Sequence, residues 1–197
     1  MSKRIASTRI AFFSAAAIGA LALTATIVAP VSAQDKMKSE MSGEKTVMVG
    51  GAAMFPSKNI IQNAVNSKDH TTLVAAVKAA GLVGTLEGKG PFTVFAPTNA
   101  AFGKLPAGTV DTLVKPENKA TLTKILTYHV VAGKIEASDL TDGKKLKTVQ
   151  GEELTVKRSG NTVMIIDAKG DSSTVTIPNV NQSNGVIHVV DTVLLPS

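Results

Sequence analysis

The periodicity of apolar residues changes once along this chain, near Gly133, and this change restricts the possible folds more than any other feature. Before Gly133 the apolar residues recur at helical spacing, whereas after it they alternate with polar residues, as in strands. Helices followed by a β meander predict an α+β domain rather than a doubly wound sheet. The expected helices are 59–65, 70–80, 106–114 and 116–129, and the expected strands are 154–158, 163–166, 175–177 and 186–190.

The first 33 residues have the pattern of a secretory signal peptide. Three basic residues precede an apolar run from Ala11 to Val28, and Val31-Ser32-Ala33 supplies the small residues of a cleavage site. We expect the mature chain to begin at Gln34, to be secreted or periplasmic, and to have no membrane span after cleavage. A retained membrane anchor is the alternative, because the apolar run is almost long enough to span a bilayer.

Charge and composition exclude several classes of function. Removal of the signal leaves 18 basic against 15 acidic residues, a net charge of +3 that is too small for a nucleic-acid footprint. The chain has no Trp and few other aromatic residues, so platforms for stacking bases are missing as well. It also has no Cys, which excludes disulfides, so the fold depends on its core alone. We expect no cofactor and no nucleic-acid partner.

Residues 34–56 are expected to form a flexible N-terminal segment, with the folded domain at 57–197. The stretch 34–44 is polar and charged without apolar periodicity, and Gly50-Gly51 weakens any strand in the more apolar stretch that follows. Thioether ligands for copper are the alternative use of the methionines here, but their spacing is irregular and no His lies nearby. These methionines are Met37, Met41, Met48 and Met54.

The stretch from Gly90 to Phe102 (GPFTVFAPTNAAF) places a buried strand directly before a helix. A phosphate-binding loop would need several glycines and a Lys after the strand, but here Gly90 precedes it. A nucleophile elbow would need Ser or Cys on a turn between close glycines, and the turn offers only Thr98. Neither catalytic interpretation fits.

A rigid structural corner fits the same stretch better. Pro97 ends the strand because it has no N–H to donate, and Thr98 or Asn99 can accept hydrogen bonds from the first N–H groups of the helix. Similarly, Asp69 or a neighbour is expected to cap the helix over 70–80, and Gly81 to end it. The apolar side chains expected to hold the corner in the core are Phe92, Val94, Phe95 and Phe102.

Three motifs in order resemble the signatures of the fasciclin domain, over about residues 57–196. Thr93 to Phe102 is similar to its first signature, Tyr128-His129 to its middle Tyr-His motif, and Asn184 to Asp191 to its second signature. The resemblance, which extends to small exported single-domain bacterial members, implies one domain with a β wedge packed against several short helices. It also implies a non-enzymatic adhesion module whose partner is a protein or a surface glycan. Signature residues with an expected structural role are Phe95, Pro97, Thr98, Asn99, Phe102, Asn184, Gly185, His188 and Asp191.

The three histidines are the only candidate bases or nitrogen ligands. They show no HxH or HExxH spacing, so neither a metal site nor a catalytic site is expected. We expect His70 to be solvated at a helix start, His129 to lie on a buried helical face, and His188 to donate to a backbone carbonyl in the core.

The acidic residues support the same conclusion. Glu152 and Glu153 are adjacent on a strand and point to opposite faces, so they cannot share a proton. Asp167 and Asp171 are too sparse for a calcium loop, and Lys169 lies between them.

Partner contacts have several candidates. Tyr128, the only Tyr, has a ring suited to contact, and His129 lies beside it; the alternative for Tyr128 is a core position with a satisfied hydroxyl. Lys144, Lys145 and Lys147 are typical of a solvated turn, or would touch anionic polysaccharide or lipid headgroups.

The resemblance also bears on integrin binding. An Asp-Ile pair linked to integrins in animal fasciclin proteins corresponds here to Asn179-Val180, which lacks the carboxylate, and no Arg-Gly-Asp occurs. Integrin binding is therefore doubtful.

Two hypotheses remain. The first is an exported non-enzymatic binding module for cell adhesion or for association with a surface or an extracellular matrix. The alternative is a small-ligand carrier or sensor that uses a cavity between the helices and the wedge.

Overall fold

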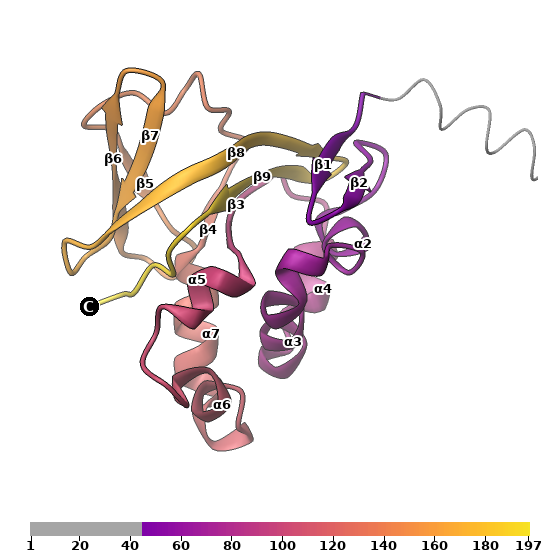
Figure 1. Cartoon of the computed structure of the whole chain (residues 1–197), viewed down its shortest axis with the longest axis vertical. Coiled ribbons are helices and arrows are strands. Elements are labelled where there is room, and N and C mark those ends of the chain that lie inside the picture. Colours follow the sequence, from indigo (N-terminus) through magenta and orange to yellow (C-terminus); the bar gives the residue numbers. More distant parts are fainter. Residues whose placement is uncertain (1–44) are drawn as a thin grey trace, which may run out of the picture. The chain divides into compact units, whose positions relative to one another are not determined.

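The computed structural model describes residues 45–197 (Figure 1). The expected signal peptide, the start of the mature chain at Gln34, and Met37 and Met41 lie outside the described residues. Within 45–197, none of the helices combines the length and the apolar character that a membrane crossing requires.

A seven-stranded mixed sheet forms the centre of the domain and confirms the α+β prediction. Its strand order is β4-β3-β9-β8-β7-β6-β5, in which β3 and β9 run parallel and the other neighbours antiparallel. Strand β8 is the longest and pairs with β9 through two register shifts. The strands are β3 (Phe92–Pro97), β4 (Val130–Ala132), β5 (Lys145–Lys147), β6 (Glu153–Ser159), β7 (Thr162–Ile166), β8 (Ser172–Gln182) and β9 (Gly185–Val190).

Short helices cover one side of the central strands, as Figure 1 shows. Gly81 has φ 75° and ends α3, as expected from the freedom of glycine in this region. Pro116 opens a 3₁₀ turn that leads directly into α7. The helices are α2 (Ile60–Ala64), α3 (Thr71–Ala80), α4 (Val83–Glu87), α5 (Asn99–Gly103), α6 (Thr109–Leu113) and α7 (Lys119–Tyr128), with 3₁₀ turns η1 (Lys68–His70) and η2 (Pro116–Asn118).

The prediction that residues 34–56 form a flexible segment is wrong for residues 45–56, the part that the structure describes. Strands β1 (Val47–Val49) and β2 (Ala52–Met54) form a hairpin, and Val49 and Met54 are each 3% exposed in the core. Gly50 and Gly51 form the two-residue loop with φ of 57° and 75°. Positive φ at both positions is what a type I′ hairpin turn requires, so the glycines that weakened the strand prediction are the hairpin's turn.

Two apolar clusters share the central strands. Val94 lies in the cluster beneath the helices, whereas its neighbour Phe95 lies in the cluster formed with β5, β6 and β7. Val189 and Val190 of β9 divide in the same way. Because alternate side chains of a strand point to opposite faces, β3 and β9 are covered on both sides. This double burial explains why the sequence of the corner is almost continuously apolar.

Candidate functional site

The corner after β3 contains two caps that serve two different helices. Thr98 Oγ1 accepts from the Ala101 N–H at 3.2 Å, and so caps α5 as expected. Asn99 instead reaches α3, where its Oδ1 accepts from the Thr72 N–H at 3.0 Å and its Nδ2 donates to the Lys68 carbonyl at 2.8 Å. The expectation that Asp69 or a neighbour caps α3 is wrong, because this cap comes from a residue distant in the chain.

Asn184 joins three segments around the start of β9. Its Oδ1 accepts from the Ile60 N–H at 3.1 Å, while its Nδ2 donates to the carbonyls of Leu86 and Gly88 at 2.7 and 2.9 Å. The next residue, Gly185, lies so close to β3 that an added Cβ would stand 2.0 Å from the Phe92 carbonyl oxygen. Asn184 and Gly185 therefore lie where the start of β9 meets β3, the start of α2 and the end of α4.

His188 is fully buried and stacks on the Phe95 ring, with 5.6 Å between the ring centroids. Its Nε2 donates to the Ile135 carbonyl at 2.9 Å, as expected, and its Nδ1 accepts from the Asn179 N–H at 3.3 Å. Burial lowers the pKa of His188. The neutral ring therefore connects β9 to the loop at residue 135 and to the irregular part of β8.

Asp191 ends the second signature at the surface. Its Oδ1 accepts from the Thr174 N–H at 2.8 Å, and its Oδ2 lies 3.4 Å from Lys104 Nζ. The aspartate thus holds the strand end, which is a common use of Asp at such positions.

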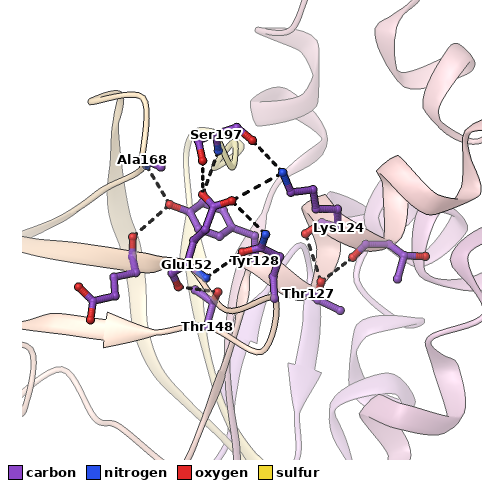
Figure 2. A network of polar contacts seen from close by, with 10 residues as sticks. Lys124, Thr127, Tyr128, Thr148, Glu152, Ala168 and Ser197 are labelled. Carbon is purple, nitrogen blue, oxygen red and sulfur yellow. Dashed lines mark hydrogen bonds and ion pairs between the residues drawn. The ribbon is translucent and has the colours of Figure 1, made fainter.

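The Tyr128 side chain is fully buried inside the domain. It belongs to the network of polar contacts shown in Figure 2. Its hydroxyl donates to the Glu153 carbonyl at 3.3 Å and accepts from the Ala168 N–H at 2.8 Å. This is the core position with a satisfied hydroxyl that was the alternative to partner contact.

The same network holds the last residue of the chain (Figure 2). The Glu152 carboxylate accepts from the N–H and the hydroxyl of Ser197, both at 2.9 Å, and lies 3.6 Å from Lys124 Nζ. Lys124 in turn donates to the Ser197 carbonyl at 2.8 Å. The hydrogen bond from the Ser197 N–H, followed by that from its hydroxyl, lowers the pKa of Glu152.

His129 is also enclosed, with 2% of its surface exposed. Its Nε2 accepts from the Leu194 N–H at 3.0 Å, so Nδ1 carries the ring proton and donates to the Ile125 carbonyl at 2.9 Å. Burial lowers the pKa of His129 to about 4. A direct contact of a partner with Tyr128 or His129 is therefore excluded in this conformation, because neither side chain reaches the surface.

The expectation of a solvated His70 is wrong, because the side chain is only 3% exposed. Its Nδ1 lies 2.9 Å from Ser67 Oγ, and its Nε2 is buried without a standard hydrogen bond. Burial lowers the pKa of His70, against a smaller opposite effect of the Ala96 carbonyl. The turn η1, which periodicity did not indicate, directs the ring inward.

The Ser67–His70 contact has the residue types of a nucleophile and a base, but it lacks the rest of a catalytic site. Ser67 is 2% exposed, so a substrate has no access to its hydroxyl. No orienting group bonds the His70 Nε2 atom. Within residues 45–197, no group of three or more His, Asp or Glu side chains could hold a metal ion.

His70 borders an apolar cavity of about 40 Å³ between the hairpin, the helices and the central strands. Sites for drug-sized ligands usually have volumes of about 300–1,000 Å³, so this cavity matches only a molecule of very few heavy atoms. Its apolar lining includes Val49, Met54, Ile60, Leu73, Val77 and Leu126.

The remaining candidates for contact lie at the surface of the sheet. Lys145 and Lys147 are exposed on the edge strand β5, and Lys145 Nζ lies 3.4 Å from Glu153. Lys144 donates to the Asp139 carbonyl at 2.8 Å. Charges on an edge strand also oppose pairing with other chains, so this patch has a structural use as well.

Asn179 has φ 55°, which makes it the one residue other than glycine with positive φ in the described part of the chain. Its Oδ1 accepts from the Ala137 N–H at 2.7 Å. The side chain at the position of the Asp-Ile pair is therefore uncharged and already engaged within the domain.

Comparison with known proteins identifies relatives over most of this chain. Residues 68–196 match the model of the fasciclin domain family. Protein sll1483 of Synechocystis is 50% identical over 153 residues, covering 78% of this chain and 82% of that protein. Immunogenic protein MPB70 of Mycobacterium bovis is 35% identical over 195 residues, covering 95% and 96%.

Among solved structures, the domain is similar to a FAS1 domain pair from the insect cell adhesion molecule fasciclin I, with a TM-score of 0.64 and 20% identity. The match covers 72% of this chain and 52% of that one, so the chain spans about half the length of the insect structure. At this identity the likeness shows the fold alone. It confirms the expected β sheet packed with short helices.

Proposed function

This chain belongs to the fasciclin domain family, and from that premise we propose that it is an exported, non-enzymatic binding module for cell adhesion or surface association. The observation that carries the proposal is the internal use of its signature side chains. The polar atoms of these side chains form hydrogen bonds that join segments of the domain. The side chains are those of Asn99, Asn184, Tyr128, His129 and His188. Side chains used in this way build a scaffold and leave recognition to the surface.

The proposed partner is a protein or a surface glycan. Membership of the fasciclin domain family, whose signatures the sequence resembles and which implies adhesion, supports a role of this kind. An integrin-type metal contact is not proposed, because Asn179 supplies no carboxylate and its amide oxygen is bonded to the Ala137 N–H. Tyr128 and His129 are proposed to act within the scaffold rather than to touch the partner.

Export is proposed from the signal-peptide pattern of residues 1–33. A deletion strain tests both parts of the proposal. Loss of the gene should reduce attachment of the cells to their surface or to one another, and the intact gene should restore it. A gene lacking codons 2–33 should fail to restore it. Unchanged attachment in the deletion strain would contradict a role in adhesion.

The small-ligand carrier is a second candidate, favoured by the cavity beside His70. The cavity is apolar, and His70, whose Nε2 makes no standard hydrogen bond, is among its lining residues. At about 40 Å³ it could hold a small alcohol, whose hydroxyl would bond that nitrogen. Titration with 1-propanol should shift the ring resonances of His70 but not those of His188. Unchanged His70 resonances, or equal shifts of His70 and His188, would contradict binding in this cavity.

A further inference from the structure

A surface groove of about 450 Å³ lies between the β6–β7 hairpin, the irregular part of β8 and the loop around residue 137. Its volume is within the usual range for sites that bind small molecules or peptide side chains. Valine and proline side chains contribute apolar surface, and four polar side chains lie among them, those of Ser138, Arg158, Asn161 and Thr176. The apolar surface comes from Val163, Val175 and Pro178.

Arg158 is placed at this groove by the alternation of β6. Leu154 and Val156 point into the core, and Arg158 continues the same row at the end of the strand, where it is exposed. It lies opposite Val163 in the register of β6 and β7. Lys157, its neighbour in sequence, points to the other face of the sheet.

Two hydrogen bonds hold the guanidinium group of Arg158 in place, but they do not use all of its N–H donors. Its Nε donates to the Gly160 carbonyl at 3.2 Å and its Nη1 to the Ala137 carbonyl at 3.4 Å. A guanidinium has five N–H donors, so three stay available. All four ion pairs found within residues 45–197 involve lysines, so the charge of Arg158 has no acidic partner among them.

The walls of the groove are fixed by hydrogen bonds. The register of β8 shifts on both sides of Ile177, and Asn179 adopts φ 55° just beyond Pro178. The Asn179 side chain bonds the Ala137 N–H, and its own N–H bonds His188. Bulges and residues with positive φ often occur beside functional sites, and a fixed site loses less entropy when it binds.

We propose that this groove binds an acidic segment of a partner protein, with a carboxylate on Arg158 and an adjacent apolar side chain on Val163, Val175 and Pro178. Two parallel N–H donors of a guanidinium match the two oxygens of a carboxylate. Asn161 and Thr176 can bond the backbone of the segment. The inference extends the proposed function, since it states the chemistry by which a protein partner would be recognised.

An anionic polysaccharide fits this groove less well than an acidic peptide. A charged polysaccharide would follow several cations, whereas the groove has one cationic side chain and an apolar floor. The lysines that could form such a track, Lys145, Lys147 and Lys157, lie on the opposite face of the same strands, because Leu146, Leu154 and Val156 between them are buried. The two faces can therefore be tested separately.

The test compares Arg158→Gln with Lys157→Gln, two neighbouring substitutions that remove the same charge from opposite faces. The probes are acetyl-Val-Glu-Val-Glu-amide and its neutral counterpart acetyl-Val-Gln-Val-Gln-amide, added to the mature chain in low salt. NMR should show shifts of the Arg158 Nε–H and of the amides of Asn161 and Thr176 with the acidic peptide. Arg158→Gln should weaken binding at least tenfold, Arg158→Lys by less, and Lys157→Gln by less than twofold.

Equal weakening by Arg158→Gln and Lys157→Gln would overturn the proposal, since it would indicate nonspecific attraction to positive charge. Equal binding of the neutral peptide, or tighter binding of polyglucuronate at the groove, would also overturn it. Thermal unfolding of each variant within a few degrees of the parent confirms that the fold is kept. If cells need the chain for attachment but Arg158→Gln leaves attachment unchanged, the groove proposal is wrong and the adhesion proposal stands. If Arg158 is needed to bind the peptide but the chain has no role in attachment, only the adhesion proposal is wrong.

Discussion

Asn99 caps a helix to which it does not belong: its Oδ1 accepts from the N–H of Thr72 at 3.0 Å. The residue opens α5, and its side chain crosses to the first turn of α3. Its Nδ2 donates to the Lys68 carbonyl, so the amide ties the corner after β3 both to α3 and to the turn before it. The first signature is thus a junction of two helices and a strand.

Asn99→Ala should lower the free energy of unfolding by about 1–2 kcal/mol, because it leaves the Thr72 N–H without its side-chain acceptor. Urea denaturation followed by far-UV circular dichroism measures the change. Asn99→Asp should lower the free energy of unfolding by less than Asn99→Ala, since a carboxylate oxygen still accepts from the Thr72 N–H. It loses the hydrogen bond to the Lys68 carbonyl. An unchanged midpoint for Asn99→Ala would contradict the cap.

Asn184→Asp should destabilise the domain more than Asn99→Ala does. The substitution is nearly isosteric, but it replaces the Nδ2 donor with an oxygen that faces the carbonyls of Leu86 and Gly88. Loss of two buried hydrogen bonds and repulsion between oxygens should cost about 3 kcal/mol or more. Thermal unfolding at neutral pH measures it, with the exposed Asn161→Asp as the matched control. Similar stability of both variants would be inconsistent with this role of Asn184.

Stability should fall on mild acidification because the buried histidines stay neutral. Burial lowers the pKa of His129 to about 4 from its usual 6.5, so between these values the unfolded chain binds more protons than the folded one. The contribution of neutral His129 to the free energy of unfolding is complete above pH 6.5 and declines as the pH falls toward 4. His129 alone should account for a loss of about 2 kcal/mol between pH 7 and pH 5.

Urea midpoints at pH 7, 6 and 5 measure this dependence. Burial also lowers the pKa of His70 and His188, so they act in the same direction. His129→Asn should flatten the dependence in part while lowering stability at pH 7. Stability that is constant from pH 7 to pH 5 would show that these rings do not resist protonation.

Tyr128→Phe should reduce stability by about 1 kcal/mol without a separate effect on attachment. The change removes the acceptor of the Ala168 N–H and keeps the buried ring. Calorimetry gives the stability, and an attachment assay at a temperature where both proteins are folded gives the function. Weaker attachment by a fully folded Tyr128→Phe protein would mean that the hydroxyl acts beyond the core.

The sequence could predict the fold class because its signals were local. Three motifs and a change of periodicity indicated helices, a meander and a rigid corner, and Gly81 and Thr98 act as local rules suggested. Strands β4 and β5 have three residues each, which is too short for alternation to indicate them. The hairpin at Gly50-Gly51 was missed because turn glycines also weaken strand propensity.

The candidate sites could be predicted less well because they depend on contacts between distant segments. Whether His70 is exposed or buried depends on how η1 packs against the hairpin, which the sequence does not indicate. Its sequence neighbours Asp69 and Thr71 are polar and suggest an exposed position. The groove combines Ala137, Arg158 and Pro178 across three elements. Its one sequence signal is that Arg158 is the only arginine after residue 9.

The central claim is that the folded chain acts by binding through its surface. Its most direct test is the binding of fluorescently labelled mature chain to intact cells or isolated envelopes of its source organism, measured by flow cytometry. We predict saturable binding that an excess of unlabelled chain displaces, that Tyr128→Phe leaves intact and that Arg158→Gln weakens. Binding that rises linearly with concentration and is not displaced would contradict the claim.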